Sequence, residues 1–248
     1  MITLKSPREI ELMREAGRVV ALCHFEISNI IKPGITTQEI DQMVEKIILE
    51  NDCIPAFKGY GGFPAATCCS PNEQVVHGFP SNTPLKDGDI ISIDIGTFYK
   101  GYVGDSAWTY AVGNISEECM MLLEQTEQSL WRGLDMIKPG VHLSDVSHAI
   151  ESHAKKYNLG IVRQFAGHGI GCDLHEEPEI LNYGQPGRGP ILKEGMTLAI
   201  EPMLNLGKDK VKIHADGWTT STVDKKPSAH FEHSIVVTKD GYEVLTKL

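Results

Sequence analysis

Two segments of the chain repeat one pattern, and this repeat constrains the fold more than any other feature. The first segment, IIKPGITTQEIDQMVEKII, begins at Ile30, and the second, MIKPGVHLSDVSHAIESHA, begins 106 residues later at Met136. In both, Lys-Pro-Gly separates two stretches with the apolar spacing of a helix, because proline and glycine stop helices. A chance match of two short turns is the alternative. We expect two halves, about 1–112 and 113–248, with one helix pair in each.

The first helix of each pair carries its own start signal. Ser6-Pro7-Arg8-Glu9 is typical of a capped helix start, with serine as N-cap, proline at the first helical position and glutamate reaching back. The apolar spacing that follows predicts a helix that runs towards Ile31. Ser116 is the corresponding N-cap in the second half, and its helix is expected to end near Ile137.

After each helix pair the apolar pattern changes to a period of two, which is typical of strands. The segment DIISIDIGTFYKGYVGDSAWTYAV predicts a hairpin with its turn at Lys100-Gly101. Three later segments, GMTLAIEPML, KIHADGWTTST and HFEHSIVVT, predict further strands, with a second hairpin turn at Asp216-Gly217. The expected fold class is therefore α+β, with helix pairs packed on an antiparallel sheet.

The composition excludes several classes of protein. The chain has 248 residues, of which 41% are hydrophobic, so it can fold as one domain around a sizeable core. A formal net charge of −10 disfavours a nucleic acid or an anionic membrane as partner. The charged N-terminus and the lack of a long apolar run predict a cytoplasmic protein without signal peptide or membrane span. Its cysteines form no Cys-x-x-Cys pair, so free thiols are expected.

Two aspartates of the predicted hairpin should point to the same side of the sheet. If Lys100-Gly101 is a two-residue loop, Asp94 faces Ala107 and Asp105 faces Gly96, so the two aspartates are diagonal neighbours. Diagonal neighbours lie about 7 to 8 Å apart at the backbone, which lets both carboxylates reach a common ion. One solvated aspartate at a strand edge is the alternative. Two unneutralised carboxylates would repel each other, so we expect a cation between them.

Two further acids interrupt apolar strand segments, Glu201 in LAIEPM and Glu232 in FEHSIVV. A carboxylate in such a strand is costly unless it is paired or bound to a metal. His168 lies between two glycines in AGHGIG, which we interpret as leaving room for the imidazole and a substrate. Four carboxylates and one imidazole suit Mn(II), Fe(II), Co(II) or Zn(II), and they balance the charge of two divalent ions.

Eight motifs follow one another along nearly the whole chain: VVHG, IDIG, GYVGDSA, GHGIG, LHEEP, IEPM, DGWT and FEHSIVVT. In this order they resemble the type I methionine aminopeptidases, in the short subtype found in bacteria. The resemblance implies a duplicated pita-bread fold, in which a curved antiparallel sheet is flanked by two helix pairs in a single catalytic domain, 1–248. It also implies a two-metal site with Asp105 and Glu232 as bridging ligands, Asp94 on one ion, and His168 and Glu201 on the other.

The resemblance also implies the residues that contact a peptide. It places His77 and His175 beside the scissile amide, and a monovalent cation near Asn72, Gln74 and Ser228. Around the methionine side chain it places Tyr60, Phe63, Cys68, Leu174 and Trp218. Three positions depart from common members of the family: Phe63 replaces tyrosine, Leu174 replaces phenylalanine and His230 replaces glutamine. These departures leave the ligands intact but affect the expected shape of the pocket.

These features together predict removal of the initiator methionine from nascent chains, near the ribosome exit, by a monomeric enzyme that prefers a small second residue. Metal-activated water would attack the amide, with Glu201 as proton shuttle, His175 at the developing oxyanion and His77 at the amide nitrogen. One alternative is an Xaa-Pro peptidase of the same fold, although such relatives usually carry an additional N-terminal domain. The other is a non-enzymatic pita-bread binding module, although such modules typically lose metal ligands.

Overall fold

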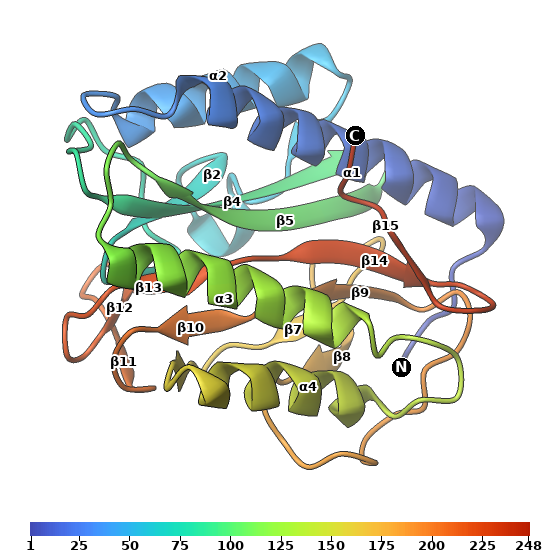
Figure 1. Cartoon of the computed structure of the whole chain (residues 1–248). Helices are drawn as coiled ribbons and strands as arrows, with labels where there is room; N and C mark the ends of the chain where they lie inside the picture. Colours follow the sequence, from blue (N-terminus) through green and yellow to red (C-terminus); the bar gives the residue numbers. More distant parts are fainter.

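The computed structural model describes residues 1–248 and contains the two expected helix pairs (Figure 1). The first pair is α1 (Pro7–Ile30) and α2 (Thr37–Glu50), and the second is α3 (Glu117–Leu134) and α4 (Leu143–Lys156). Both predicted N-caps are confirmed: Ser6 Oγ accepts a hydrogen bond from Glu9 N, and Ser116 Oγ accepts one from Cys119 N. α1 and α2 lie over β4 (Ile90–Tyr99) and β5 (Tyr102–Ala111), while α3 and α4 cover the later strands.

The repeat is visible in the structure at the predicted offset. α4 begins and ends 106 residues after α2, and β6 (Gly160–Ile161) follows β1 (Ile54–Pro55) by the same interval. Glu39 and Asp145 occupy equivalent positions, because each carboxylate accepts a hydrogen bond from the backbone N–H of its N-cap residue. The first helices differ in length: α3 ends at Leu134, not near Ile137. Beyond Leu134 the chain continues in tighter turns, because Met136 N and Ile137 N donate to carbonyl oxygens three residues back, those of Gly133 and Leu134, at 3.1 and 2.9 Å.

The β4–β5 hairpin has the predicted register. Asp94 pairs with Ala107, and Gly96 pairs with Asp105. Lys100 and Gly101 both have positive φ, 48° and 85°, as a two-residue hairpin turn requires. β2 (Thr67–Pro71) and β1 also pair with β4, and all of these pairings are antiparallel.

The second half builds a five-stranded antiparallel sheet in the order β15-β14-β9-β7-β8. Its strands are β7 (Gly167–Gly169), β8 (Glu176–Ile180), β9 (Thr197–Ile200), β14 (His233–Val237) and β15 (Tyr242–Val244). Two three-stranded sheets adjoin it, in the orders β13-β10-β6 and β11-β12-β3. They contain β3 (Gln74–Val76), β10 (Met203–Asn205), β11 (Val211–Ile213), β12 (Thr220–Thr222) and β13 (Ser228–His230).

The prediction that two segments each form one continuous strand was wrong, because each strand is interrupted at its glutamate. The segment GMTLAIEPML forms β9 and then β10, with Glu201 and Pro202 between them. The segment HFEHSIVVT forms the end of β13 and then β14, with Phe231 and Glu232 between them. At each break the chain passes from one sheet to another, which turns the carboxylate out of the ladder. The turn at Asp216-Gly217 lies, as predicted, in the connection between β11 and β12.

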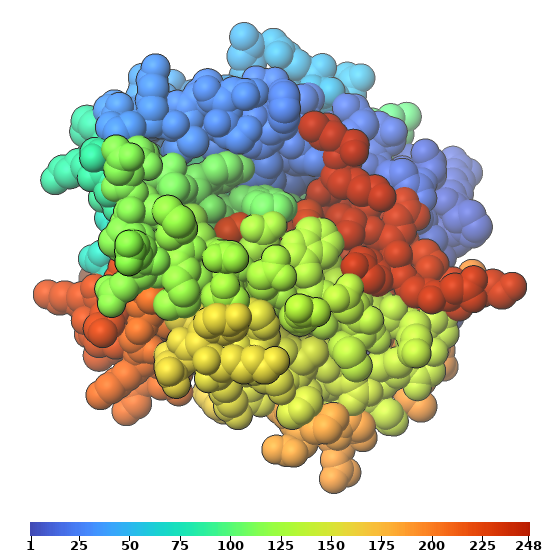
Figure 2. Space-filling model, viewed as in Figure 1, coloured from blue at the N-terminus to red at the C-terminus, as the bar shows by residue number.

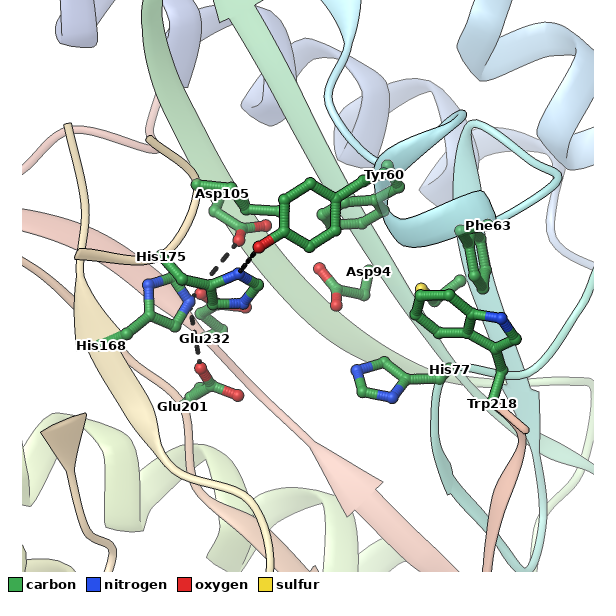
Figure 3. A pocket seen from close by; sticks show the side chains of 13 residues that line it. Tyr60, Phe63, His77, Asp94, Asp105, His168, His175, Glu201, Trp218 and Glu232 are labelled. Carbon is green, nitrogen blue, oxygen red and sulfur yellow. Dashed lines mark hydrogen bonds and ion pairs between the residues drawn. The ribbon is translucent and has the colours of Figure 1, made fainter. Parts of the chain in front are cut away.

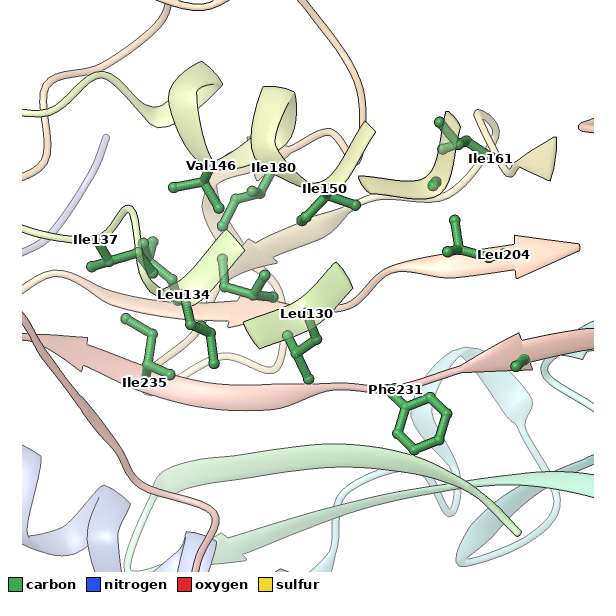
Figure 4. Close-up of a cluster of buried hydrophobic side chains, with 14 of the residues drawn as sticks. Leu130, Leu134, Ile137, Val146, Ile150, Ile161, Ile180, Leu204, Phe231 and Ile235 are labelled. Carbon is green, nitrogen blue, oxygen red and sulfur yellow. The ribbon is translucent and has the colours of Figure 1, made fainter. Parts of the chain in front are cut away.

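Each helix pair covers its own apolar cluster. One cluster joins α1 and α2 to Ile91, Ile93 and Ile95 on β4, which are all 0% exposed. The larger cluster joins α3 and α4 to the strands of the second half, with Leu130 and Ile150 among its fully buried members (Figure 4). A depression between α1, α3 and the C-terminal segment opens on the face shown in Figure 2. None of the helices is long and apolar enough to cross a membrane.

Candidate active site

All five predicted metal ligands line one cavity of about 130 Å³. Asp94 projects from β4 and Asp105 from β5, on the diagonal that the hairpin register predicts. His168 lies on β7, Glu201 directly follows β9, and Glu232 directly precedes β14. Figure 3 shows that their side chains converge on one space, although the ligands lie as far apart in sequence as positions 94 and 232.

The ligand atoms are close enough to share ions. His168 Nε2 lies 3.4 Å from Glu201 Oε1 and 4.0 Å from Asp105 Oδ2. Donor atoms of Asp105, His168 and Glu232 lie within 4.8 Å of one another, as do those of Glu201, His230 and Glu232. His168 Nδ1 donates to the carbonyl oxygen of Gly169 at 2.9 Å, which leaves Nε2 as the nitrogen that can bind a metal.

The carboxylates are poorly satisfied without a cation. Asp94 Oδ1, Asp105 Oδ1 and Glu232 Oε1 are buried and have no hydrogen-bond partner. Burial raises the pKa of Asp94 to about 7, and burial followed by the charge of Asp94 raises the pKa of Asp105 well above its usual value. Burial likewise raises the pKa of Glu201 and Glu232. Divalent cations would fit this donor set, because they satisfy the free oxygens and remove the repulsion.

The glycines beside His168 are required by the close packing of the sheet. A Cβ on Gly167 would lie 2.3 Å from the carbonyl oxygen of Ala199, and one on Gly169 would lie 2.0 Å from that of Glu177. These oxygens belong to the chain segments on either side of β7, so the glycines let neighbouring backbones approach closely. The sequence predicted room for the imidazole and a substrate, and the contacts in the sheet are a further reason for glycine at both positions.

The predicted substrate residues line the same cavity as the ligands. The members that the sequence analysis named are Tyr60, Phe63, Cys68, His77, Leu174, His175 and Trp218. Phe63 and Trp218 form an edge-to-face pair with centroids 5.2 Å apart, which closes one end of the pocket (Figure 3). Phe57 also lines the cavity and was missed. A signal existed in Gly96, where a Cβ would lie 2.7 Å from Phe57 Cε1, since a glycine within a strand often marks a close approach.

Two histidines lie beside the ligands, and both are neutral near pH 7. Tyr60 Oη and His175 Nδ1 are 2.8 Å apart and share a hydrogen bond, and the rings of His175 and His168 are 4.3 Å apart. Burial lowers the pKa of His175, and burial and then the charge of His230 lower the pKa of His77 to about 4. His77 has a φ of 61°, a left-handed conformation that is uncommon for histidine and recurs at functional sites.

His230 contacts the carboxylate of Glu201, which the sequence did not indicate. Its Nε2 atom lies 3.5 Å from Glu201 Oε2, on the opposite carboxylate oxygen from His168, and it has no hydrogen-bond partner. The side chain is 2% exposed. The signal in the sequence was the short spacing to Glu232, because positions 230 and 232 share one face of a strand. No local pattern indicated that His230 would meet Glu201.

The chain resembles characterised proteins over its whole length. A model of metallopeptidase family M24 matches residues 11–239. Methionine aminopeptidase 1 of Bacillus subtilis is 55% identical over 248 residues, which are 100% of both chains. The crystal structure of methionine aminopeptidase from Thermotoga maritima matches with a TM-score of 0.99 and 46% identity, again over 100% of both chains. The prolidase from Pyrococcus furiosus matches with a TM-score of 0.81 and 25% identity, over 99% of this chain and 65% of that one.

The solved structures confirm the predicted pita-bread fold. The chain belongs to metallopeptidase family M24 and, within it, to the methionine aminopeptidases.

Proposed function

We propose that this protein removes the N-terminal methionine from nascent proteins and peptides in a metal-dependent hydrolysis, with a preference for a small second residue. One observation carries the proposal: a set of carboxylates and imidazoles and an apolar side pocket share a single cavity. The hydrolytic site and the recognition of one apolar side chain are then adjacent, as an enzyme that cleaves behind one terminal residue requires.

We propose that Asp94, Asp105, His168, Glu201 and Glu232 would together hold two divalent ions. Supporting observations are the short distances among the donor atoms and the buried oxygens that lack partners. Divalent ions at such a site act as Lewis acids, which make water a usable nucleophile near neutral pH and polarise a carbonyl group. Mn(II), Fe(II), Co(II) and Zn(II) all suit oxygen and imidazole donors.

The methionine side chain would occupy the apolar end of the cavity. The walls there come from Tyr60, Phe63, Cys68, Leu174 and Trp218, together with Phe57. Phe63, Cys68 and Leu174 are all buried, so an unbranched thioether would exchange water for close apolar contacts. The edge-to-face pair of Phe63 and Trp218 limits the depth of the pocket, which disfavours longer or branched side chains.

Three side chains would handle the protons and the charge of the reaction. Glu201 would take a proton from the attacking water and return it to the leaving amine, because its carboxylate lines the cavity beside the other ligands. His175 would donate a hydrogen bond to the developing oxyanion, with its ring held by the hydroxyl of Tyr60. His77 would contact the amide nitrogen from the opposite wall of the cavity.

We further propose that the two halves, about 1–112 and 113–248, form one catalytic domain, since the cavity takes ligands from both. The protein would act as a cytoplasmic monomer on nascent N-termini near the ribosome exit, where such substrates arise. A monovalent cation near Asn72, Gln74 and Ser228 remains part of the proposal. Its support is that Ser228 N donates to the carbonyl oxygen of Asn72 at 2.9 Å, so two of the three residues adjoin.

Cleavage of a Met-Xaa-Ser peptide series tests the function, with kcat/KM as readout and an N-acetylated peptide as control. We expect alanine, glycine or serine at the second position to be processed faster than leucine or lysine, because His77 and His230 narrow the space next to the ligands. One or two methylene groups in a closed pocket change binding by about 1 to 3 kcal/mol. Cleavage of the acetylated peptide, or equal rates for alanine and leucine, would contradict the proposal.

A further inference from the structure

A buried ion pair joins the N-terminal segment to the loop that carries His175. Lys5 Nζ lies 2.5 Å from Glu176 Oε2, and the two side chains are only 4% and 16% exposed. The backbone of Lys5 is fixed as well, because its N–H donates to the carbonyl oxygen of Gly195 at 2.7 Å. Thr3 Oγ1 donates to the same Glu176 oxygen at 3.0 Å and accepts a hydrogen bond from Lys5 Nζ. Neither charge has a role in the proposed chemistry.

The second oxygen of Glu176 folds the loop back on itself. Glu176 Oε1 accepts a hydrogen bond from Cys172 N at 2.8 Å, and Asp173 N lies 3.5 Å away. The loop closed in this way contains Leu174 and His175, which both line the cavity. Its first residue is also held, because Val103 N on β5 donates to the carbonyl oxygen of Gly171 at 2.9 Å.

Gly171 is the residue that lets the ion pair approach the loop. A Cβ at this position would lie 2.3 Å from Lys5 Cε and 2.3 Å from Glu176 Oε1. Any larger residue would therefore displace one member of the pair. Burial by itself would raise the pKa of Glu176, but its bonds to Lys5 and Thr3 hold that pKa below the usual value, so the carboxylate is charged and needs Lys5.

We propose that Lys5 is a positioning residue, which latches the loop 171–176 through Glu176 and thereby sets where Leu174 and His175 lie in the cavity. The inference rests on the proposed function, because it assigns the latch to a peptidase site. His175 is fixed from its other side by the hydroxyl of Tyr60, 2.8 Å from Nδ1. Without the latch, the ring of His175 would be held by the hydroxyl of Tyr60 and by packing on His168, and a misplacement of about 1 Å can lower a rate by roughly 100-fold.

The charges of the pair provide the test. Removal of one partner of a buried pair leaves the other charge uncompensated, whereas removal of both leaves no buried charge. Lys5→Met keeps the length of the side chain and removes its charge. The double variant Lys5→Met/Glu176→Gln removes both charges and keeps an amide oxygen that can accept from Cys172 N. Lys155→Met is the control, because it breaks an ion pair of 2.8 Å with Glu151 within α4, a helix that contributes no residue to the cavity.

Three quantities are measured on each metal-loaded variant: amide hydrogen exchange of residues 171–176, metal content after dialysis, and kcat and KM for Met-Ala-Ser. For Lys5→Met we expect faster exchange in this loop, unchanged metal content and a kcat about 10- to 100-fold lower. The double variant should recover most of the loop protection and of the kcat. Lys155→Met should match the wild type in all three.

The inference is overturned if loop exchange in Lys5→Met equals that of Lys155→Met, or if the double variant recovers nothing. Failure of both Lys5 variants to fold would also contradict it, because a local latch should leave the rest of the fold intact. Loss of metal from Lys5→Met would contradict it as well, because Lys5 would then stabilise the whole site and not only the loop. If the wild type does not cleave Met-Ala-Ser while loop exchange changes as expected, the proposed function fails and the latch stands.

Discussion

The two faces of the sheet around β5 and β14 differ in how their buried polar groups are satisfied, although neighbouring residues form both faces. Asp105 and Glu232 face the cavity, where one oxygen of each lacks a partner. On the other side, His24 shares hydrogen bonds with Tyr110 Oη at 2.8 Å and with the carbonyl oxygen of Ser106 at 3.0 Å. The pKa of His24 is lowered by burial to about 4, so the ring is neutral at pH 7.

This contrast shows what a metal site looks like when it is compared with ordinary buried polar packing in the same fold. The face with His24 is neutral and its polar atoms find partners within the protein. The cavity face collects four carboxylates whose pKa values burial raises, and one oxygen each of Asp94, Asp105 and Glu232 has no partner. A bound cation or protonation must therefore satisfy the second arrangement, whereas the first needs neither.

The largest effect is expected from Asp105→Asn, which removes a carboxylate proposed to lie between two ions. Mutating an outer partner of a metal ligand typically costs about 10- to 100-fold in affinity, and this variant should lose more. His175→Ala should retain metal, because His175 is not a proposed ligand. Trp108→Phe, on the opposite face of β5 beside His233, should retain both metal and activity. Equal metal retention after dialysis in Asp105→Asn and His175→Ala would refute the assignment.

Glu201→Gln should lower kcat by more than its loss of metal explains. The amide keeps the shape of the side chain but cannot carry the proton, and general acid–base catalysis contributes about 100- to 10,000-fold. Turnover is measured at saturating metal, with metal content determined on the same sample. A return to wild-type turnover at full metal occupancy would show that Glu201 acts only as a ligand.

Thermal stability should respond to metal in a pH-dependent way. The pKa of Asp94 is raised from 3.8 to about 7 without metal, so its protonated form stabilises the metal-free fold below pH 3.8, and this contribution is lost as the pH rises through 7. Metal ions compete with protons for the same oxygens. The gain in Tm on metal addition should therefore grow from pH 5 to pH 8, reaching several degrees, since a ligand at 100 times its Kd adds about 2.7 kcal/mol. A gain that does not change with pH would place the bound metal elsewhere.

The opposite face should show a smaller pH effect that does not depend on metal. The pKa of His24 falls from 6.5 to about 4 on folding because of burial. Above pH 6.5 the ring is neutral in both the folded and the unfolded chain, so it does not reduce the free energy of unfolding there. Stability is lost as the pH falls from 6.5 towards 4, by at most about 3 kcal/mol for this group. His24→Gln should flatten the urea-unfolding free energy across this range, with or without metal. An unchanged slope would mean that His24 is not the group responsible.

Short-range signals predicted much of this structure. The serine caps predicted where α1 and α3 begin, and the turn at Lys100-Gly101 together with the period of two predicted the diagonal between Asp94 and Asp105. Each of these signals depends on a few adjacent residues. The breaks at Glu201 and Glu232 were missed because strand propensity does not record where a chain changes sheets. The roles of the glycines were also not predictable, because each depends on a backbone that is remote in sequence.

The residues of the site also fall into those that local motifs predict and those that they do not. Its ligands and most of its pocket were named from motifs, whereas Phe57 and the contact between His230 and Glu201 emerged only from the packing. The pair of Lys5 and Glu176 joins residues 171 positions apart, and no local pattern indicates that they meet. Residues that act directly on a substrate or a metal were thus easier to predict than the residues that hold them in place.

Cleavage of peptides by metal-depleted and metal-restored protein tests the central claim most directly. Met-Ala-Ser, an Xaa-Pro peptide and an unrelated peptide are each incubated with protein that has been treated with chelator and then reloaded. The account predicts that only Met-Ala-Ser is cleaved at an appreciable rate, that chelation abolishes this cleavage, and that a divalent ion restores it. Full activity of the metal-free protein, or preferred cleavage of the Xaa-Pro peptide, would contradict it.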